Sequence, residues 1–227
     1  MNPKILEIFE DEFDDVEKDD TVDEDILDTE WVENFFYRNY RRGKVLDLGC
    51  GGGYFFDHLP ITHALEPNVK RMKRAMNRRI IEYTDYGEKE SRTVYVLQGF
   101  AEEIQIPFSS NIFNTVFSWG TMCFVRSMME VLCSVNKALV MGGRFIFDVN
   151  TFSTMPIVQT VHPECFIRYV DLFGFKLIER REFGIHYHNR VALAVEKYEE
   201  FNPKRFHMLQ CVKEKKLNYL EERDWFI

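Results

Sequence analysis

No apolar run in this 227-residue sequence approaches the roughly 18 residues that a membrane-spanning helix needs. The first residues, MNPKILEIFEDEFDD, are acidic, whereas a secretory signal peptide begins with a basic segment. The five cysteines are scattered and never spaced as CxxC, which is unlike the usual zinc and disulfide patterns. We therefore predict a cytoplasmic protein with reduced thiols, no metal site and no membrane contact.

The net charge is −8, but the acidic residues are concentrated at one end of the chain. Residues 1–30 contain 14 acidic and 2 basic side chains, so the rest of the chain has a small basic excess. Such an uncompensated charge favours a solvated segment over a packed one. We predict an acidic N-terminal leader over residues 1–30, either solvated or acting as a lid or partner-binding tail.

The sequence also lacks internal repeats and any linker rich in proline or glycine, so a single domain is expected. From residue 44 onward, short apolar segments alternate with helix-like ones, which is typical of βαβ units around a parallel sheet. The predicted strands are 44–48, 63–66, 93–98, 115–119, 144–148, 175–181 and 190–197. The connection between the last two is too short for a crossover helix, so these two should pair antiparallel.

These segments predict an α/β fold, doubly wound, with a seven-stranded, mostly parallel sheet and an antiparallel last strand. We assign residues 31–200 to this domain and residues 201–227 to a C-terminal extension that packs on it. Two helices have clear local signals. The helix over 68–81 begins at a capping Asn68 and buries a stripe of Met72, Met76 and Ile80. The helix over 128–140 ends at Gly142-Gly143.

A glycine-rich loop, Gly49-Cys50-Gly51-Gly52-Gly53, follows the first strand. Glycine there lets the backbone approach a ligand, and open α/β sheets bind ligands at the carboxyl ends of their strands. The dinucleotide pattern GxGxxG fails in both registers, because Tyr54 and Phe56 stand where glycine is required. The phosphate-binding P-loop pattern fails too, since no Gly-Lys-Ser/Thr follows. A pyrophosphate ligand is therefore disfavoured.

Glu66 ends the second strand, 17 residues after Gly49. A carboxylate at this place can accept both hydroxyls of a ribose. The alternative is that Glu66 only ends an exposed strand. A ribose without a pyrophosphate points to a nucleoside that carries some other group.

The loop VLDLGCGGGYF resembles the first motif of the class I S-adenosylmethionine-dependent methyltransferases, and HALEPN resembles their second. LQGFAEEIQIPF is similar to their adenine-binding segment, and NTVFSWGTMCFV with ALVMGGRFIFDV to their fourth and fifth strands. The resemblance runs from about residue 44 to residue 197 and is closest to a compact branch that acts on small molecules. It implies a Rossmann-like fold and S-adenosyl-L-methionine as cofactor.

The resemblance also implies roles for individual residues. The glycine loop would pack against the methionine part of the cofactor, Asp47 would hold its amino end, and Glu66 would accept the ribose hydroxyls. Phe100 stands where the family often has a polar residue, so ring packing would replace one contact with adenine. The full set of predicted cofactor-binding residues is Asp47, Gly49, Cys50, Gly51, Gly53, Glu66, Pro67, Phe100, Ala101, Glu102, Ser118 and Trp119.

Methyl transfer from a sulfonium needs alignment and exclusion of water, and a base only when the acceptor must lose a proton. No catalytic residue can therefore be assigned, and His162, in the segment after the fifth strand, is a candidate base. His186 and His188 share one face of an extended segment, but no third metal ligand is visible near them. Trp31, Phe35 and Tyr37, within 28–40, could wall an acceptor cleft or simply pack on the body.

The acceptor itself is open. We predict methylation of an O or N atom of a small molecule by a monomer or homodimer. RNA or protein is the alternative acceptor, because one helix carries a basic face made of Lys70, Arg71, Lys73, Arg74, Arg78 and Arg79. A further alternative is a partner subunit that binds the cofactor without catalysis.

Overall fold

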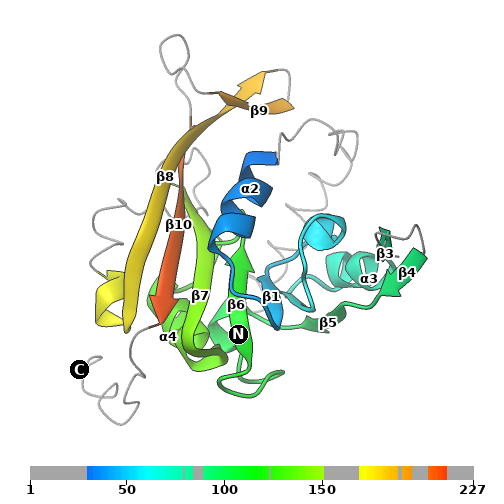
Figure 1. Ribbon diagram of the computed structural model, residues 1–227, viewed down its shortest axis with the longest axis horizontal. Coiled ribbons are helices and arrows are strands. Elements are labelled where there is room, and N and C mark those ends of the chain that lie inside the picture. Colours follow the sequence, from blue (N-terminus) through cyan, green and yellow to red (C-terminus); the bar gives the residue numbers. More distant parts are fainter. Residues whose placement is uncertain are drawn as a thin grey trace.

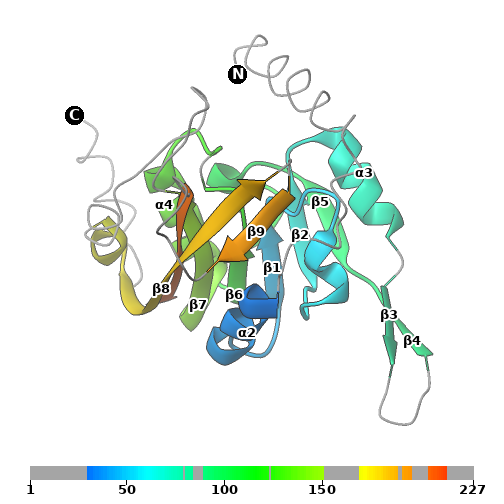
Figure 2. The ribbon, with the colours of Figure 1, turned by 90° about the horizontal axis from the view of Figure 1, so that it is seen from above.

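A twisted β-sheet with helices on both of its faces forms the body of the protein in a computed structural model (Figures 1 and 2). The structure describes residues 30–78, 80–83, 89–122, 124–150, 169–188, 191–195 and 204–213. Helices α2 (Glu30–Asn39) and α4 (Met128–Ala138) lie on opposite faces of the sheet (Figure 2). None of the described helices combines the length and apolarity that crossing a bilayer would require.

Five parallel strands form one half of the sheet, in the order β5-β2-β1-β6-β7. Their bounds are β1 (Val45–Leu48), β2 (His63–Glu66), β5 (Tyr95–Gln98), β6 (Phe113–Ser118) and β7 (Leu139–Asn150). All four residues of β1 are buried, as expected for a central strand covered on both faces. The mostly parallel, doubly wound α/β sheet predicted from the sequence is confirmed, and these five strands lie at the predicted segments.

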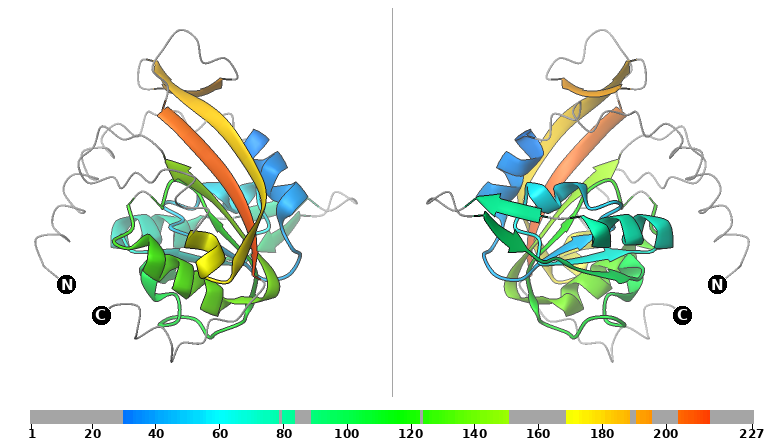
Figure 3. Two further views of the ribbon diagram at one scale, coloured as in Figure 1. Left: turned by 90° about the vertical axis from the view of Figure 1, so that its left-hand side faces the viewer. Right: turned by 90° about the vertical axis from the view of Figure 1, so that its right-hand side faces the viewer.

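The other half of the sheet corrects the sequence prediction. It contains β8 (Phe175–His188), β9 (Val191–Val195) and β10 (Lys204–Lys213), so the described sheet has eight strands rather than seven. β9 pairs antiparallel with β8, as predicted. However, the reversed strand next to the parallel half is β10, which pairs antiparallel with both β7 and β8 (Figure 3). Residues 204–213 lie beyond the segments that carry the family resemblance, and their partners β7 and β8 are distant in the sequence, so this strand was not predicted.

Each face of the sheet has its own apolar core. On the α4 face, Val131, Leu132 and Val135 pack with β-strand residues such as Phe145. On the α2 face, Phe36 packs edge-on against Phe117 at a centroid distance of 5.4 Å. The central strands are therefore buried on both faces, as in other sheets that have a layer of helices on each side.

The two predicted helices form, but with different ends. α3 (Val69–Asn77) begins as predicted, because the Asn68 side chain accepts the Arg71 backbone N–H at 3.0 Å. The predicted stripe forms only in part. Met72 packs against the core, but Met76 is 58% exposed, Ala75 is the buried residue, and Ile80 begins β3 (Ile80–Tyr83). β3 forms an antiparallel hairpin with β4 (Lys89–Arg92) that projects from the body (Figure 2). α4 ends at Ala138 and not at the glycine pair, since β7 begins directly at Leu139.

Lys213, at the end of β10, connects the C-terminal strand to the core. Its side chain is buried, and its Nζ donates to the carbonyl oxygens of Asn136 at 2.5 Å and Leu139 at 2.8 Å. Nζ also donates to Asn111 Oδ1 at 3.2 Å. The last carbonyl groups of a helix have no hydrogen-bond partner within the helix. The buried Lys213 ammonium supplies donors for them, and its positive charge interacts favourably with the negative end of the helix dipole.

We expect Lys213→Met to lower the free energy of unfolding by about 2–4 kcal/mol, because it leaves buried carbonyl oxygens of the α4 end without a donor. Urea denaturation followed by circular dichroism measures this change. Lys73→Met, at an exposed position of α3, is the control and should change stability by less than about 0.5 kcal/mol. Equal stability of the two variants would show that Lys213 does not secure β10.

Candidate functional site

The carboxyl ends of four neighbouring parallel strands bring polar residues to one edge of the sheet. β1 leads into the glycine loop, β2 ends at Glu66, β6 ends at Ser118, and β7 carries Asp148 near its end. All three side chains are buried. This edge is where open α/β sheets bind their ligands.

The glycine loop is held against β2 by its own backbone. Gly49 N–H and Cys50 N–H both donate to Leu65 O, at 2.8 and 3.2 Å. Gly49, Gly51 and Gly53 have φ angles of 77°, 55° and 83°, in the left-handed region that side chains disfavour. A Cβ on Gly49 would lie 2.2 Å from Thr121 Oγ1, whereas a Cβ on Gly51 would meet no atom within 4 Å. Gly51 therefore faces open space.

Glu66 links the loop to β2 and α3. Its Oε2 accepts Gly51 N–H at 2.8 Å, and its Oε1 accepts Asn68 N–H at 2.9 Å. Burial raises the pKa of this carboxyl, while the two backbone hydrogen bonds and nearby Arg71 act in the opposite direction. Each carboxylate oxygen has a second lone pair, so Glu66 can still accept from a ligand. The loop and Glu66, which the sequence placed in one site, are in direct contact.

Asp47 is buried beneath the loop, and its Oδ2 has no hydrogen-bond partner in the described part of the chain. Burial raises the pKa of Asp47 to about 8, and the carboxylate of Glu66 adds to the shift. Burial, with the same two acids nearby, also raises the pKa of the Cys50 thiol, so this thiol stays protonated. A positively charged ligand group would relieve the cost of burying these carboxylates.

Asp148 is a site residue that the sequence analysis missed. Its Oδ1 accepts Gly120 N–H at 2.7 Å, which fixes the loop after β6. Burial raises the pKa of Asp148 to about 7. Ser118 Oγ lies buried on the strand next to β7 and has no partner among the described residues, and Trp119 is half-buried beside Phe55. Glu66 was singled out because it is an acidic residue at the carboxyl end of a parallel strand. The same criterion would have identified Asp148.

The predicted adenine segment forms η3 (Ala101–Glu103). Ala101 is buried, and the Phe100 ring lies 4.8 Å below the guanidinium of Arg126. Glu102 turns toward the start of α4, where its Oε1 accepts Arg126 N–H at 2.6 Å. The carboxylate of Glu102 thus has a structural contact that the sequence did not indicate, and its contact with a cofactor stays a prediction.

The remaining predicted residues are only partly placed. Pro67 is half-buried, and its carbonyl accepts Gln98 Nε2 at 3.3 Å. His162 lies outside the described residues, as do the side chains of His186 and His188. Within the described ranges, no three His, Cys, Asp or Glu side chains gather closely enough to hold a metal ion. Phe35 is 1% exposed, so it packs in the core and is not a wall of an acceptor cleft.

Two sets of atoms fit S-adenosylmethionine. Glu66 and the Gly51 backbone offer a carboxylate and open space for a ribose and its neighbouring carbon chain. The unpartnered Oδ2 of buried Asp47 can accept a hydrogen bond from an ammonium group. S-adenosylmethionine carries both a ribose diol and a cationic amino end, so the residues present are compatible with it.

Comparison with known proteins gives the same result. Residues 46–147 match the family described as a methyltransferase domain. A tRNA U34 carboxymethyltransferase of Hydrogenovibrio crunogenus is 25% identical over 134 residues, which are 54% of this chain and 39% of that protein. The chain thus spans about two fifths of the length of that curated relative.

Solved structures share the fold over most of their length. A methyltransferase in complex with the Trm112 activator of Haloferax volcanii superposes with a TM-score of 0.63 and 17% identity, covering 87% of this chain and 94% of that one. A Thermotoga maritima S-adenosylmethionine-dependent methyltransferase, described as a possible histamine N-methyltransferase, gives a TM-score of 0.56 and 19% identity. It covers 86% of this chain and 99% of its own.

The described part of the chain has a Rossmann-like fold of the methyltransferase kind. Residues 46–147, just under half of the chain, match the methyltransferase-domain family, and the fold is shared with S-adenosylmethionine-dependent methyltransferases. S-adenosylmethionine is the cofactor that these similarities imply.

Gly51→Ala tests whether the open space above the loop is the cofactor site. The new methyl group would project into that space, so we expect roughly tenfold weaker binding of S-adenosylmethionine with a stability loss near 1 kcal/mol from the positive φ. Isothermal titration calorimetry measures the affinity. Gly52→Ala is the matched control, because its φ is ordinary and its nearest neighbour is the flexible Arg74 side chain at 3.1 Å. Equal affinities would place the cofactor elsewhere.

Proposed function

We propose that this protein transfers a methyl group from S-adenosylmethionine to an O or N atom of a small-molecule acceptor. The observation that carries the proposal is the contact between Glu66 Oε2 and Gly51 N–H at 2.8 Å, beside the open space over Gly51. The cofactor supplies an electrophilic methyl group on a sulfonium. The residues of the chain bind it, orient it and exclude water, which is most of what this reaction requires.

The proposed orientation uses Asp47 and Glu66 at the two ends of the cofactor. Asp47 would hold the amino end and Glu66 the ribose, so the sulfonium would lie between them, above the ends of β1 and β6. Ser118 ends β6 and Trp119 follows it, so both would lie closest to the transferred group. The half-buried Trp119 ring would form one apolar wall of the acceptor site.

Asp148 is proposed as the group that takes up a proton from the acceptor. An amine or hydroxyl acceptor loses a proton on methylation, and a base works best when its pKa is near the operating pH. The pKa of about 7 for Asp148 meets this condition, and on β7 Asp148 directly follows Phe147, the residue that pairs with Ser118. His162, which the sequence suggests as a base, stays a second candidate for this role.

The test is formation of S-adenosylhomocysteine from S-adenosylmethionine and a panel of amines, phenols and hydroxy acids, followed by mass spectrometry. A methylated small molecule would support the proposed acceptor class. A kcat lowered roughly 100-fold in Asp148→Asn, with cofactor affinity unchanged, would support Asp148 as the base. Methyl label found only in RNA or protein would assign the acceptor to a macromolecule. Cofactor binding without turnover on any acceptor would favour a non-catalytic partner subunit.

A further inference from the structure

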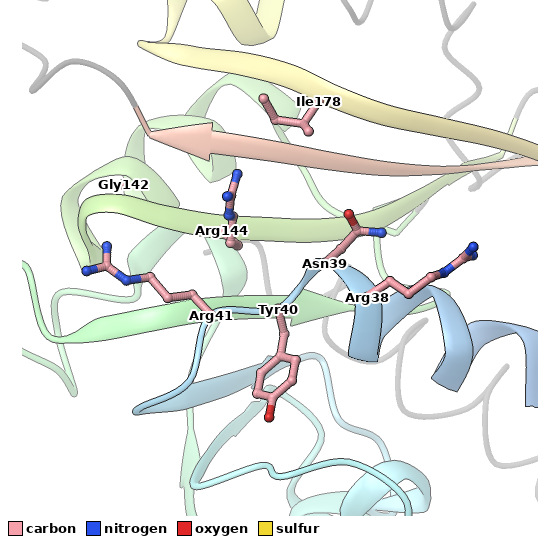
Figure 4. A pocket seen from close by; sticks show the side chains of 7 residues that line it. All are labelled: Arg38, Asn39, Tyr40, Arg41, Gly142, Arg144 and Ile178. Carbon is pink, nitrogen blue, oxygen red and sulfur yellow. The ribbon is translucent and has the colours of Figure 1, made fainter.

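A second site lies away from the glycine loop, toward the other end of the parallel strands. It is a hollow of about 580 Å³ between the end of α2, the start of β7 and β8 (Figure 4). We call it the arginine hollow, and its lining residues are Arg38, Asn39, Tyr40, Arg41, Gly142, Arg144 and Ile178. Arg144 pairs with Thr115, which pairs with Val45, the first residue of β1. Asp148 is four residues further along β7, about 13 Å away.

The lining of the hollow is positively charged. It contains three arginines and neither an Asp nor a Glu. Arg38 Nε donates to Asn34 O at 3.2 Å and Arg41 Nη1 to Met141 O at 2.7 Å, so both contact neutral carbonyls. Within the described ranges, none of the three guanidinium groups forms an ion pair with a carboxylate. A guanidinium stays charged at every relevant pH, so the lining of the hollow carries three positive charges.

One carboxylate approaches the hollow without entering its lining. Glu179 Oε2 accepts Asn39 Nδ2 at 2.7 Å. This contact holds the end of α2 against β8 and fixes the position of the Asn39 amide. Within the described ranges, this carboxylate forms no ion pair with an arginine of the hollow.

The positive groups stand on fixed parts of the fold. The Arg41 backbone N–H donates to Thr115 Oγ1 at 2.8 Å, and the same hydroxyl donates to Arg41 O at 3.0 Å. Thr115 is fully buried in β6. The Tyr40 ring stacks on Phe36 at 5.0 Å, and Arg144 is half-buried on β7. The backbone that carries Arg41 and the strand that carries Arg144 are therefore fixed, which lowers the entropy lost when a ligand binds.

We infer that the arginine hollow binds a phosphoryl anion, either free or as part of a nucleotide chain. Guanidinium groups recognise phosphate through paired N–H donors, and the hollow has room for a group of nucleotide size. Figure 4 shows the arginine side chains spread along the hollow rather than pointing at one spot. This arrangement suits a ligand with more than one phosphoryl group. The inference does not depend on the methyl acceptor proposed above.

Calorimetry of the full chain with pyrophosphate, and fluorescence anisotropy with a labelled ten-nucleotide oligouridylate, test the inference at 50 mM NaCl. We expect Arg144→Gln and Arg41→Gln each to weaken binding of the probe about tenfold. Arg42→Gln is the matched control, since Arg42 is the exposed neighbour of Arg41 and does not line the hollow; it should change affinity less than twofold. Raising NaCl to 200 mM should weaken binding of the oligonucleotide further.

The two probes distinguish the sources of the phosphoryl group. If oligouridylate binds tightly and pyrophosphate displaces it, the ligand of the hollow is a nucleic-acid backbone. If only pyrophosphate binds, the ligand is a small phosphorylated molecule. Neither probe binding, or equal weakening by Arg144→Gln and Arg42→Gln, would overturn the inference. S-adenosylmethionine affinity, expected to be unchanged in every variant, reports that each one is folded. Its loss in the unmodified chain would count against the cofactor site and not against the hollow.

Discussion

Glu66→Ala is expected to weaken binding of S-adenosylmethionine by roughly 10- to 150-fold, the equivalent of about 1.5–3 kcal/mol for a charge-assisted hydrogen bond. Two effects add. The proposed acceptor of the ribose hydroxyls is lost, and Gly51 N–H and Asn68 N–H lose the carboxylate that now holds them at 2.8 and 2.9 Å. Isothermal titration calorimetry with S-adenosylmethionine and with S-adenosylhomocysteine measures the change.

Glu66→Gln separates these effects. The amide keeps one oxygen for a backbone N–H and has the same size, but it loses the negative charge and one acceptor. We expect an affinity between those of the original protein and Glu66→Ala. Circular dichroism melting of the same samples reports folding. A folded Glu66→Ala variant with unchanged affinity would show that the ribose is held by another group.

The contact between the glycine loop and Glu66 could be predicted from the sequence because both follow or end neighbouring strands. Gly49 and Gly51 follow β1 directly, and Glu66 is the last residue of β2. Adjacent parallel strands bring their carboxyl ends together, so the order of the strands alone places Glu66 beside the loop. Their 2.8 Å contact follows from the chain direction and needs no knowledge of distant packing.

The parts that failed depend on contacts between distant segments. β10 lies between β7 and β8, and no local pattern in residues 204–213 identifies these two neighbours. Lys213 is charged and would be placed on the surface, yet it is buried against the end of α4. Similarly, the helical spacing of apolar residues predicts that Met76 is buried, but Ala75 is buried in its place. The hollow formed by Arg41 and Arg144 joins residues 103 positions apart and has no sequence signal.

The affinity for S-adenosylmethionine should rise by on the order of tenfold per pH unit between pH 6 and pH 7.5, because Asp47 must lose its proton to hold a cation. Burial and the nearby Glu66 carboxylate raise the pKa of Asp47 to about 8, so the carboxyl is mostly protonated at pH 6. The positive amino end of the cofactor stabilises the carboxylate and so drives proton release. Above pH 8 the gain should stop, since the cofactor's own amino group, with an ordinary pKa of about 8, loses its charge.

Asp47→Asn should remove this pH dependence and leave an affinity close to that of the original protein at pH 6. Calorimetry at pH 6 in two buffers of different ionisation enthalpy should detect about one proton released per cofactor bound, and none in Asp47→Asn. Asp57→Asn, at an exposed carboxylate, is the control and should keep the slope.

The same shift has a consequence for stability in the absence of cofactor. The folded state holds the Asp47 proton more tightly than the unfolded chain, whose carboxyl has an ordinary pKa of 3.8. Its contribution to folding is therefore complete below about pH 4 and is lost as the pH rises toward 8. The urea midpoint of the cofactor-free protein should fall between pH 6 and pH 8, less so in Asp47→Asn, and saturating cofactor should restore it. A flat affinity profile together with a flat midpoint would show that Asp47 is not the group that meets the cationic end of the cofactor.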